Sequence, residues 1–419
     1  MKTKIIASIA VVGTVAALAA LATNNSVGGF RGSRFLQSTS EVSDETLKTF
    51  QGFVQTHNKN YLTKEEYNAR LAVFSKNLAF VMSHDSAALG FELGINKFAD
   101  LSSEEFDKMQ GLKVPPACPP GCTCPNCTSQ NGSCPPGCTC PKCTSQNGSC
   151  PPGCTCSKCA SKAAVESEGG SGGHCADKSA KTDDTPEADG GSDGRCLQSS
   201  YPDSINWVTK GAVNAVRNQG GCGGCYTFSS VASLEGAYFI KNGALPMFSE
   251  QQLLDCSSSY GNSGCFGGLM SNAFTYLKTH KAMTRSSYPY TATAGACKYD
   301  TADGVITTTG YTSITKNDPD AHMAALQNGP VSIAIAASSS YFQFYKTGVI
   351  TSTGCGTSVN HAVNMVGYGT DTASGNPYWL IRNSWGANWG DQGYFKVLRG
   401  SSNSAGICGI LSLSSQPTI

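Results

Sequence analysis

Two cysteines three residues apart in a glycine-rich turn are the residues of this chain best suited to chemistry. The turn, residues 218–228, reads Asn-Gln-Gly-Gly-Cys-Gly-Gly-Cys-Tyr-Thr-Phe and contains Cys222 and Cys225. The next segment, 226–240, has apolar side chains at helical spacing and stops at Asn242-Gly243, which is typical of a helix C-cap. Cys225 is therefore expected at a helix N-terminus, where free backbone N–H groups and the helix dipole favour a thiolate. The stretch indicates a reactive-thiol site.

Three kinds of site contain a Cys-x-x-Cys pair. A thioredoxin-like redox pair needs a strand before the motif and a βαβ unit around it, and a zinc site needs a second Cys/His pair at ligand spacing. Neither context is found in the sequence. The third kind, a cysteine nucleophile beside a separate structural cysteine, needs a distant histidine as base and a residue that orients it.

Candidates for the base and for the orienting residue follow downstream. His361 lies in the apolar-rich run 359–369, which ends in glycines and predicts a buried strand. Asn383 lies near the end of a second strand-like run, 378–386. A neutral thiol is a poor nucleophile, so an adjacent imidazolium that lowers its pKa and an amide that fixes the ring tautomer would both serve the reaction.

These motifs resemble those of the papain family of cysteine proteases and are most similar to the cathepsin L type. That family carries C-G-[SA]-C-[WY] around its nucleophile, with His and Asn about 130–150 residues downstream. Here His361 and Asn383 follow Cys225 by 136 and 158 residues. The chain departs from the pattern at Gly224, where Ser or Ala is expected, and has the less usual Tyr226. Neither change removes a reacting atom.

The resemblance implies a role for each of these residues. Cys225 would be the nucleophile, and His361 would be its base and later the acid for the leaving amine. Asn383 would orient the imidazole, and Trp385 would shield the hydrogen bond between these two residues from water. Gln219 would stabilise the oxyanion of the tetrahedral intermediate together with the Cys225 backbone N–H. No metal or cofactor is expected at this site.

The resemblance also implies an α+β, papain-like fold for residues 198–419, with a helical lobe and a β-barrel-like lobe on either side of the cleft. An extended substrate would pair with the backbone of Gly267 and Gly268. The pocket for the second residue before the cut would be lined by five apolar side chains: Leu269, Met270, Ala334, Ala362 and Leu413. Because Leu413 replaces the acidic residue of relatives that accept Arg, we expect an apolar residue there, with Leu or Val favoured over Phe.

The catalytic domain contains seven cysteines, so that six can pair and one remains for the nucleophile. The resemblance implies the pairs Cys222–Cys265, Cys256–Cys297 and Cys355–Cys408.

Residues 1–22 are a short basic start followed by an apolar run that ends in Ala-Leu-Ala, which predicts a secretory signal peptide. The alternative is an uncleaved membrane anchor; no later segment is apolar enough to span a bilayer. We expect a protein of the secretory pathway, located in a lysosome-like acidic vacuole or outside the cell. The formal net charge of +1 over 419 residues argues against nucleic acid or an anionic membrane surface as partner.

Residues 43–112 are predicted to form a small helical domain. A helix around 47–56 precedes a second one that opens with the capping-box sequence Thr63-Lys-Glu-Glu66. The second helix is similar to the ERFNIN signature of papain-type propeptides and carries its residues on one face: Glu66, Arg70, Phe74, Asn77 and Val81. Val81 stands in place of the signature's Ile, and Asp85 stands in place of its last Asn. Residues 94–100 match the accompanying G-x-N-x-F-x-D motif. The resemblance implies an inhibitory proregion; a generic surface helix is the alternative.

Residues 113–197 are unlike the usual short connection of the family. A sixteen-residue unit with cysteines spaced C-x3-C-x-C-x2-C begins at Cys118, Cys134 and Cys150. The units are almost free of apolar residues, so disulfides or thiolate-bound zinc or copper(I) would have to order them, and disulfides are favoured in an oxidising compartment. Three N-x-[ST] triplets, at Asn126, Asn131 and Asn147, are consistent with glycosylation. The segment from 160 to 195 is rich in Gly, Ser and Asp.

The sequence as a whole predicts a cysteine endopeptidase that is made as a zymogen and acts as a monomer. Its expected partners are protein and peptide substrates and its own propeptide. Two other interpretations remain open: a catalytically silent binding protein on the same scaffold, and a metal-thiolate protein that acts through the repeats.

Overall fold

The computed structural model describes residues 42–114, 201–402 and 404–419. The described residues from Ser43 onward belong to one compact unit. They contain three buried apolar clusters: one centred on the proregion, one among the helices of the catalytic domain and one on its sheet. The expected signal peptide and the cysteine repeats lie outside the described residues.

The proregion is helical, as predicted. Its main helices pack through aromatic rings, with Phe74 of the second helix 5.1 Å from Phe50 and 5.0 Å from Phe53 of the first. Thr63 caps the second helix by accepting a bond from the Glu66 N–H, but the Glu66 carboxylate accepts from Leu62 N–H, so the predicted capping box is only half formed. The elements are α1 (Asp44–Thr56), α2 (Lys64–Met82), α3 (Ser86–Leu89), β1 (Phe91–Leu93) and α4 (Ser103–Asp107).

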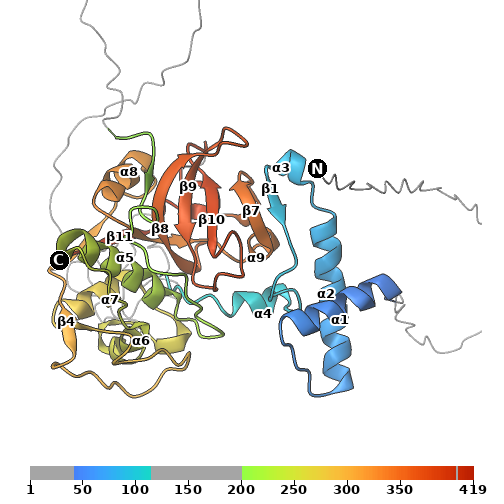
Figure 1. Ribbon diagram of the computed structural model, residues 1–419, viewed down its shortest axis with the longest axis horizontal. Coiled ribbons are helices and arrows are strands. Elements are labelled where there is room, and N and C mark those ends of the chain that lie inside the picture. The colour runs from blue at the N-terminus through green and yellow to red at the C-terminus, as the bar shows by residue number, and fades with distance from the viewer. Residues whose placement is uncertain (1–41, 115–200, 403) are drawn as a thin grey trace, which may run out of the picture. The chain divides into compact units, whose positions relative to one another are not determined.

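The first half of the catalytic domain is a helical lobe built on α5 (Cys225–Asn242), shown with α6 and α7 in green and yellow in Figure 1. Helix α5 ends at Gly243, whose φ of +72° is the left-handed C-cap that the sequence predicts. Every residue of α5 from Cys225 to Gly236 is buried, so this helix is a central element of the lobe. The other elements are α6 (Glu250–Cys256), η1 (Ser258–Tyr260), η2 (Gly264–Phe266), α7 (Met270–Leu277), β3 (Ala282–Met283) and β4 (Gly304–Ile306).

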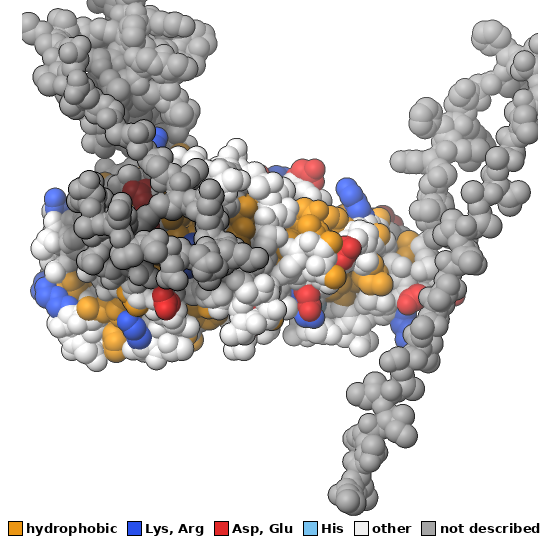
Figure 2. Space-filling model, turned by 90° about the horizontal axis from the view of Figure 1, so that it is seen from above, with side chains coloured by type: hydrophobic (Ala, Val, Ile, Leu, Met, Phe, Trp, Pro, Cys, Tyr) orange, Lys and Arg blue, Asp and Glu red, His pale blue; other side chains and the backbone are white. Residues whose placement is uncertain are grey.

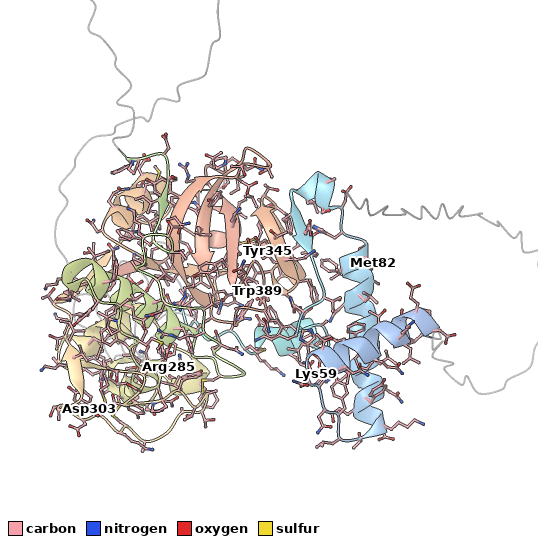
Figure 3. The ribbon with its side chains drawn as sticks, in the orientation of Figure 1. Lys59, Met82, Arg285, Asp303, Tyr345 and Trp389 are labelled. Atoms are coloured by element: carbon pink, nitrogen blue, oxygen red, sulfur yellow. A yellow bond between two sulfur atoms is a disulfide. The ribbon has the colours of Figure 1, made fainter. Side chains whose placement is uncertain are left out.

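The second half is rich in strands from Gly310 onward, and the α+β class is as predicted. Its mostly antiparallel sheet has the order β1-β7-β10-β9-β8-β6-β11-β5, with β2 also paired to β8. Aromatic rings lie in its core. The ring centroids of Tyr345 and Trp389, which are labelled in Figure 3, are 5.8 Å apart. The elements are β2 (Ile205–Asn206), β5 (Gly310–Ser313), α8 (Pro319–Gln327), β6 (Val331–Ile335), α9 (Ser340–Gln343), β7 (Tyr345–Ile350), η3 (Thr353–Cys355), β8 (His361–Thr370), β9 (Pro377–Arg382), β10 (Tyr394–Leu398), η4 (Ile407–Gly409) and β11 (Ser414–Thr418).

The proregion extends this sheet, because β1 pairs antiparallel with β7. Beside this pairing, the side chain of Asn96 donates to the carbonyl of Gln343 at 2.8 Å, and the Gln343 side chain donates to the carbonyl of Phe98 at 3.0 Å. Asn96 and Phe98 belong to the motif at 94–100. This motif therefore acts as a docking element as well as a turn within the proregion.

Among the described residues, three disulfides join Cys222 to Cys265, Cys256 to Cys297, and Cys355 to Cys408. These are the pairs that the family resemblance implies. The first two lie in the helical lobe, and the third ties η3 to η4 in the strand-rich lobe.

The described surface in Figure 2 carries acidic and basic side chains scattered among polar and apolar ones, with no large patch of one sign on that face. No helix within the described parts of the chain is long and apolar enough to cross a membrane.

Candidate active site

Cys225 is the first residue of α5 and is fully buried. Gly224 precedes it without any side-chain cap, so the first N–H groups of the helix are left for other partners. The backbone N–H of Ala362, the residue after His361, donates to Cys225 Sγ at 3.4 Å. This bond places the start of β8 beside the thiol. Cys225 is also the one cysteine of the described residues that is outside a disulfide.

His361 and Asn383 meet because β8 and β9 are neighbouring strands. His361 opens β8, Asn383 directly follows β9, and His361 Nε2 lies 2.9 Å from Asn383 Oδ1. The amide orientation is fixed independently, since the backbone N–H of Ser384 can only donate and does so to the same Oδ1 at 2.8 Å. Nε2 must therefore carry the proton, and Nδ1, which has no hydrogen-bond partner among the described residues, is free to accept one.

The Trp385 ring stacks on the imidazole of His361, with ring centroids 4.7 Å apart and an interplanar angle of 24°. Phe98 and Phe106 of the proregion pack edge-on against the same indole at 5.5 and 5.2 Å. The histidine and the asparagine are consequently closed off from solvent on this side, and both are buried.

Burial opposes the charged forms of both the thiol and the imidazole in this proenzyme. It raises the pKa of Cys225 to about 11, although N–H groups of Ala362 and Gly111 oppose the shift. Burial also lowers the pKa of His361 to about 4, against the hydrogen bond to Asn383. Desolvation of the thiol under the proregion therefore opposes the thiolate that the helix N-terminus and these N–H groups favour.

This charge state predicts slow alkylation of the proenzyme. At pH 7 a thiol with a pKa of about 11 is ionised only to roughly one part in 10⁴. Iodoacetamide should therefore modify Cys225 at least about 100-fold more slowly in the proenzyme than in the enzyme freed of its proregion, and the rate in the proenzyme should rise with pH. The measurement is the mass of the peptide containing Cys225 over time, and equal rates at pH 7 would contradict the prediction.

Gln219 lies six residues before Cys225 in the sequence, and its amide is held in one orientation. The hydroxyl of Ser384 donates to Gln219 Oε1 at 2.6 Å, so the amide nitrogen points the other way. Gln219 Nε2 donates to the carbonyl oxygens of Cys222 and of Met109, both at 3.1 Å. A carbonyl of the proregion thus occupies the position in which this amide can bind a substrate oxygen.

The proregion backbone runs through the site in extended form. Gly268 N–H donates to the carbonyl of Gly111 at 2.9 Å, and Lys113 N–H donates to the carbonyl of Gly268 at 3.2 Å, as in a parallel bridge. Leu112 N–H donates across the cleft to the carbonyl of Asn360 at 3.0 Å. The close approach requires glycines, since a Cβ on Gly267 would lie 2.5 Å from the Gly111 oxygen.

Leu112 is 8% exposed and belongs to the buried cluster of the helical lobe. The same cluster brings together all five side chains predicted for the specificity pocket, from Leu269 and Met270 beyond η2, Ala334 on β6, Ala362 on β8 and Leu413 before β11. These residues come from segments far apart in the sequence, and all are apolar. The proregion thus contributes a leucine to the apolar cluster that contains the predicted pocket residues.

Sequence reasoning missed Ser384, which fixes both Gln219 and Asn383, and the proregion residues that enter the site, Met109, Gly111 and Leu112. Ser384 stands next to Asn383 in the sequence, but a serine after a strand carries no signal of its own. In the described ranges, no group of three His, Cys, Asp or Glu side chains is placed to hold a metal ion.

Comparisons with known proteins identify the family of this chain. Residues 201–418 match the model of the papain family of cysteine proteases, and residues 50–106 match the cathepsin propeptide inhibitor domain. The probable cysteine protease RD21C of Arabidopsis thaliana is 34% identical over 397 residues, covering 92% of this chain and 71% of the relative. Cathepsin L1 of Drosophila melanogaster is 47% identical over 223 residues, covering 52% of this chain and 59% of the relative.

Solved proenzyme structures share the fold. Digestive procathepsin L 3 from the larval midgut of Tenebrio molitor superposes with a TM-score of 0.66 at 28% identity, covering 90% of this chain and 100% of that one. The recombinant stem bromelain precursor gives a TM-score of 0.66 at 29% identity, covering 90% and 99%. The predicted papain-like α+β fold and hydrolase class are confirmed. The chain therefore belongs to the papain family of cysteine proteases and carries a cathepsin-type propeptide inhibitor domain ahead of its protease domain.

Proposed function

We propose that the protein is an endopeptidase zymogen whose nucleophile is Cys225. Once the proregion has left, water re-enters the cleft, and the Cys225 proton moves to His361 Nδ1 to give a thiolate and an imidazolium. One observation supports this assignment: His361 Nε2 is fixed by its bond to Asn383, which leaves Nδ1 of the same ring free to accept a proton.

The reaction then takes two steps. Sγ attacks the scissile carbonyl carbon, and the resulting oxyanion accepts hydrogen bonds from Gln219 Nε2 and from the backbone N–H of Cys225. The C–N bond breaks as His361 gives its proton to the leaving amine, which leaves a thioester on Cys225. Water, deprotonated by His361, attacks the thioester carbonyl and releases the acid product together with the thiol. The carbonyl of Met109, bound by Gln219 Nε2 in the proenzyme, supports the oxyanion position.

The cleft is proposed to cut within chains rather than at their ends. The region from Cys265 to Cys297 contains a single histidine, His280, and its ring stacks on Tyr276 at 4.3 Å. No paired histidines are present there to bind the carboxylate of a chain end. The direct test of the function is labelling by E-64, a covalent inhibitor of this family: the acid-treated protein should carry it on Cys225, with loss of peptide hydrolysis in proportion.

Processing is proposed to remove everything before roughly Leu197 to Tyr201, including the proregion at 43–112 and the cysteine repeats, and to leave the catalytic domain, 198–419, as the enzyme. The proregion acts as the inhibitor until then. The three disulfides of the catalytic domain support localisation to the secretory pathway. The proposed destination is an acidic vacuole or the extracellular space. A silent binding protein has no observation in its favour, because all four reacting or orienting side chains are present. The metal-thiolate alternative concerns the repeats, outside the described residues.

The five apolar side chains of the predicted pocket, which share a buried cluster with Leu112, support an apolar preference at the second residue before the cut. A buried leucine contributes about 1.5–3 kcal/mol, which corresponds to roughly ten- to a hundredfold in rate, whereas an arginine would be buried without a counter-ion. A positional-scanning peptide library should rank Leu or Val above Phe and far above Arg. Leu413→Glu should raise acceptance of Arg at this position. Arg preferred by the unmodified enzyme would refute the pocket assignment.

A further inference from the structure

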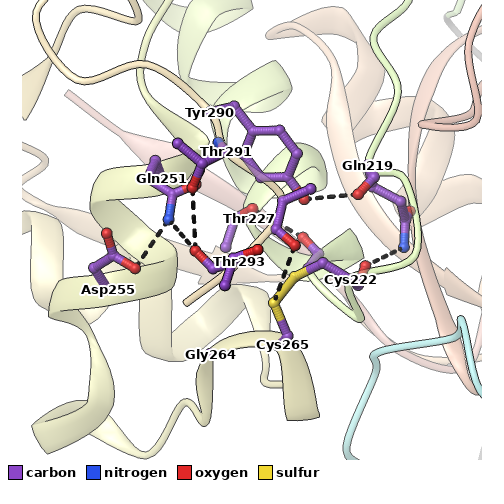
Figure 4. The surroundings of a disulfide bond; sticks show 12 residues. Gln219, Cys222, Thr227, Gln251, Asp255, Gly264, Cys265, Tyr290, Thr291 and Thr293 are labelled. Atoms are coloured by element: carbon purple, nitrogen blue, oxygen red, sulfur yellow. Dashed lines mark hydrogen bonds between the residues drawn. A yellow bond between two sulfur atoms is a disulfide. The ribbon is translucent and has the colours of Figure 1, made fainter. Parts of the chain in front are cut away.

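The backbone of Gln219 is held from two sides. Its N–H donates to the carbonyl of Ser384, in the strand-rich lobe, at 2.8 Å. Its carbonyl accepts a hydrogen bond from the hydroxyl of Tyr290, in the helical lobe, at 2.8 Å. Figure 4 shows this second bond reaching the start of the glycine-rich turn that ends at Cys225. The residue that presents its amide to the oxyanion is therefore fixed by one contact from each lobe.

The ring of Tyr290 is itself fixed. It meets Phe228 of α5 edge-on, with ring centroids 4.8 Å apart and an interplanar angle of 84°. The guanidinium of Arg285, labelled in Figure 3, lies over the ring at 5.8 Å and is paired with the buried carboxylate of Glu250 on α6. Burial, and secondarily the charge of Glu250, raises the pKa of Tyr290 far above its usual value, so the hydroxyl remains a donor.

The loop that carries Tyr290 is anchored to α6 by one buried side chain. Gln251 accepts from the backbone N–H of Thr291 at 2.9 Å and donates to the carbonyl of Thr293 at 2.8 Å (Figure 4). Gln251 also donates to Asp255, which in turn accepts from Gly295 N–H at 2.7 Å. The loop is thus braced at three backbone positions, and Tyr290 projects from a rigid support.

The same loop lies directly against the glycine-rich turn. A Cβ built on Gly224 would be 3.5 Å from the Tyr290 hydroxyl, and one built on Gly220 would be 3.5 Å from Cβ of Ala292. Gly220 has a φ of +65°, which glycine adopts at little cost. Glycines in the turn let the loop approach closely, and the Tyr290 hydroxyl then supplies the one side-chain hydrogen bond from this loop to Gln219.

We infer that Tyr290 is a positioning residue for the oxyanion-binding amide of Gln219. Without its hydroxyl, the carbonyl of Gln219 loses its hydrogen bond from the helical lobe, and the turn can shift relative to Cys225. Oxyanion stabilisation depends steeply on the donor position, and even small displacements of a positioned group are costly in rate. Tyr290 acts only through Gln219 and does not touch the substrate. The inference rests on the proposed function, in which Gln219 binds the oxyanion.

The test is Tyr290→Phe in the acid-activated full chain, with active sites titrated by E-64. The expected result is about tenfold lower kcat with KM within twofold, and a similar loss of affinity for a peptide aldehyde, whose adduct with Cys225 places an oxyanion at the same position. Tyr260→Phe is the control in the same lobe. Its hydroxyl pairs with the hydroxyl of Thr279 at 2.9 Å and takes no part in the bracing of the Tyr290 loop, so kcat should stay within twofold of the unmodified enzyme.

A double-mutant cycle separates the positioning role from a general structural one. Gln219→Ala alone should lower kcat by about 10² to 10³, and Tyr290→Phe should then add nothing further. An unchanged kcat for Tyr290→Phe, or the same loss in the presence and absence of Gln219, would overturn the inference while leaving the proposed function intact. If Gln219→Ala itself keeps full kcat, the oxyanion assignment of the proposed function is what fails.

Discussion

Cys225→Ser is expected to abolish peptide hydrolysis, with kcat lowered by at least about 10⁴-fold, and to stop self-processing of the full chain. The substitution keeps the size of the side chain but replaces a thiol with a hydroxyl that does not ionise in the working pH range. The imidazole of His361 can stabilise a thiolate, whereas it cannot produce a lasting alkoxide. Hydrolysis of a peptide substrate and the appearance of the processed chain on a gel are the measurements.

The loss should be chemical rather than structural. The variant is expected to unfold at the temperature of the unmodified proenzyme and to be cut at the normal site by added active enzyme. Ser230→Ala is a suitable control on the same helix, because it removes only a hydrogen bond to the carbonyl of Tyr226, at 2.8 Å, and should keep activity. Turnover retained by Cys225→Ser would exclude this residue as nucleophile.

Local patterns predicted the elements that carry the reacting groups. The helix from Cys225 to Asn242 was predictable because its apolar spacing is framed by a glycine-rich start and a Gly243 cap. Strand β8 was predictable because a run of apolar residues begins at His361 and is buried through Gly369. In both cases the signal lies within about twenty consecutive residues, which a single sequence contains in full.

Contacts between distant segments were not predictable in the same way. The orientation of the Gln219 amide depends on a hydroxyl 165 residues later, at Ser384, and nothing local to either residue indicates the pair. The helix N-terminus that favours a Cys225 thiolate is visible in the sequence, but the burial that raises the pKa of this thiol in the proenzyme is not. The apolar pocket could be proposed only through the family resemblance, because its five residues come from four separate segments.

The proregion inhibits through a point of contact that tolerates only glycine, and Gly111→Ala should therefore release inhibition. A Cβ on Gly111 would overlap the carbonyl of Gly223 and lie 2.6 Å from its Cα. The opposing atoms belong to the backbone of the turn before Cys225. The Cys222–Cys265 disulfide and the hydrogen bond from Gly223 N–H to the carbonyl of Cys265, at 3.1 Å, hold this turn in place, so its displacement would cost free energy. The hydrogen bond from Gly268 to Gly111 would have to lengthen as well.

Overpacking of this kind costs about 1–3 kcal/mol, which is roughly ten- to a hundredfold in the equilibrium between the closed and open proregion. The unprocessed Gly111→Ala chain should therefore hydrolyse peptides at neutral pH and accept E-64 on Cys225, whereas the unmodified proenzyme does neither at a comparable rate. Gly52→Ala is the matched control in the same proregion: it lies in the exposed part of α1, where a Cβ has no atom within 4 Å, and alanine favours the helix. That variant should stay as inactive as the unmodified proenzyme. Equal and low neutral-pH activity in both variants would show that the contact at Gly111 does not hold the site closed.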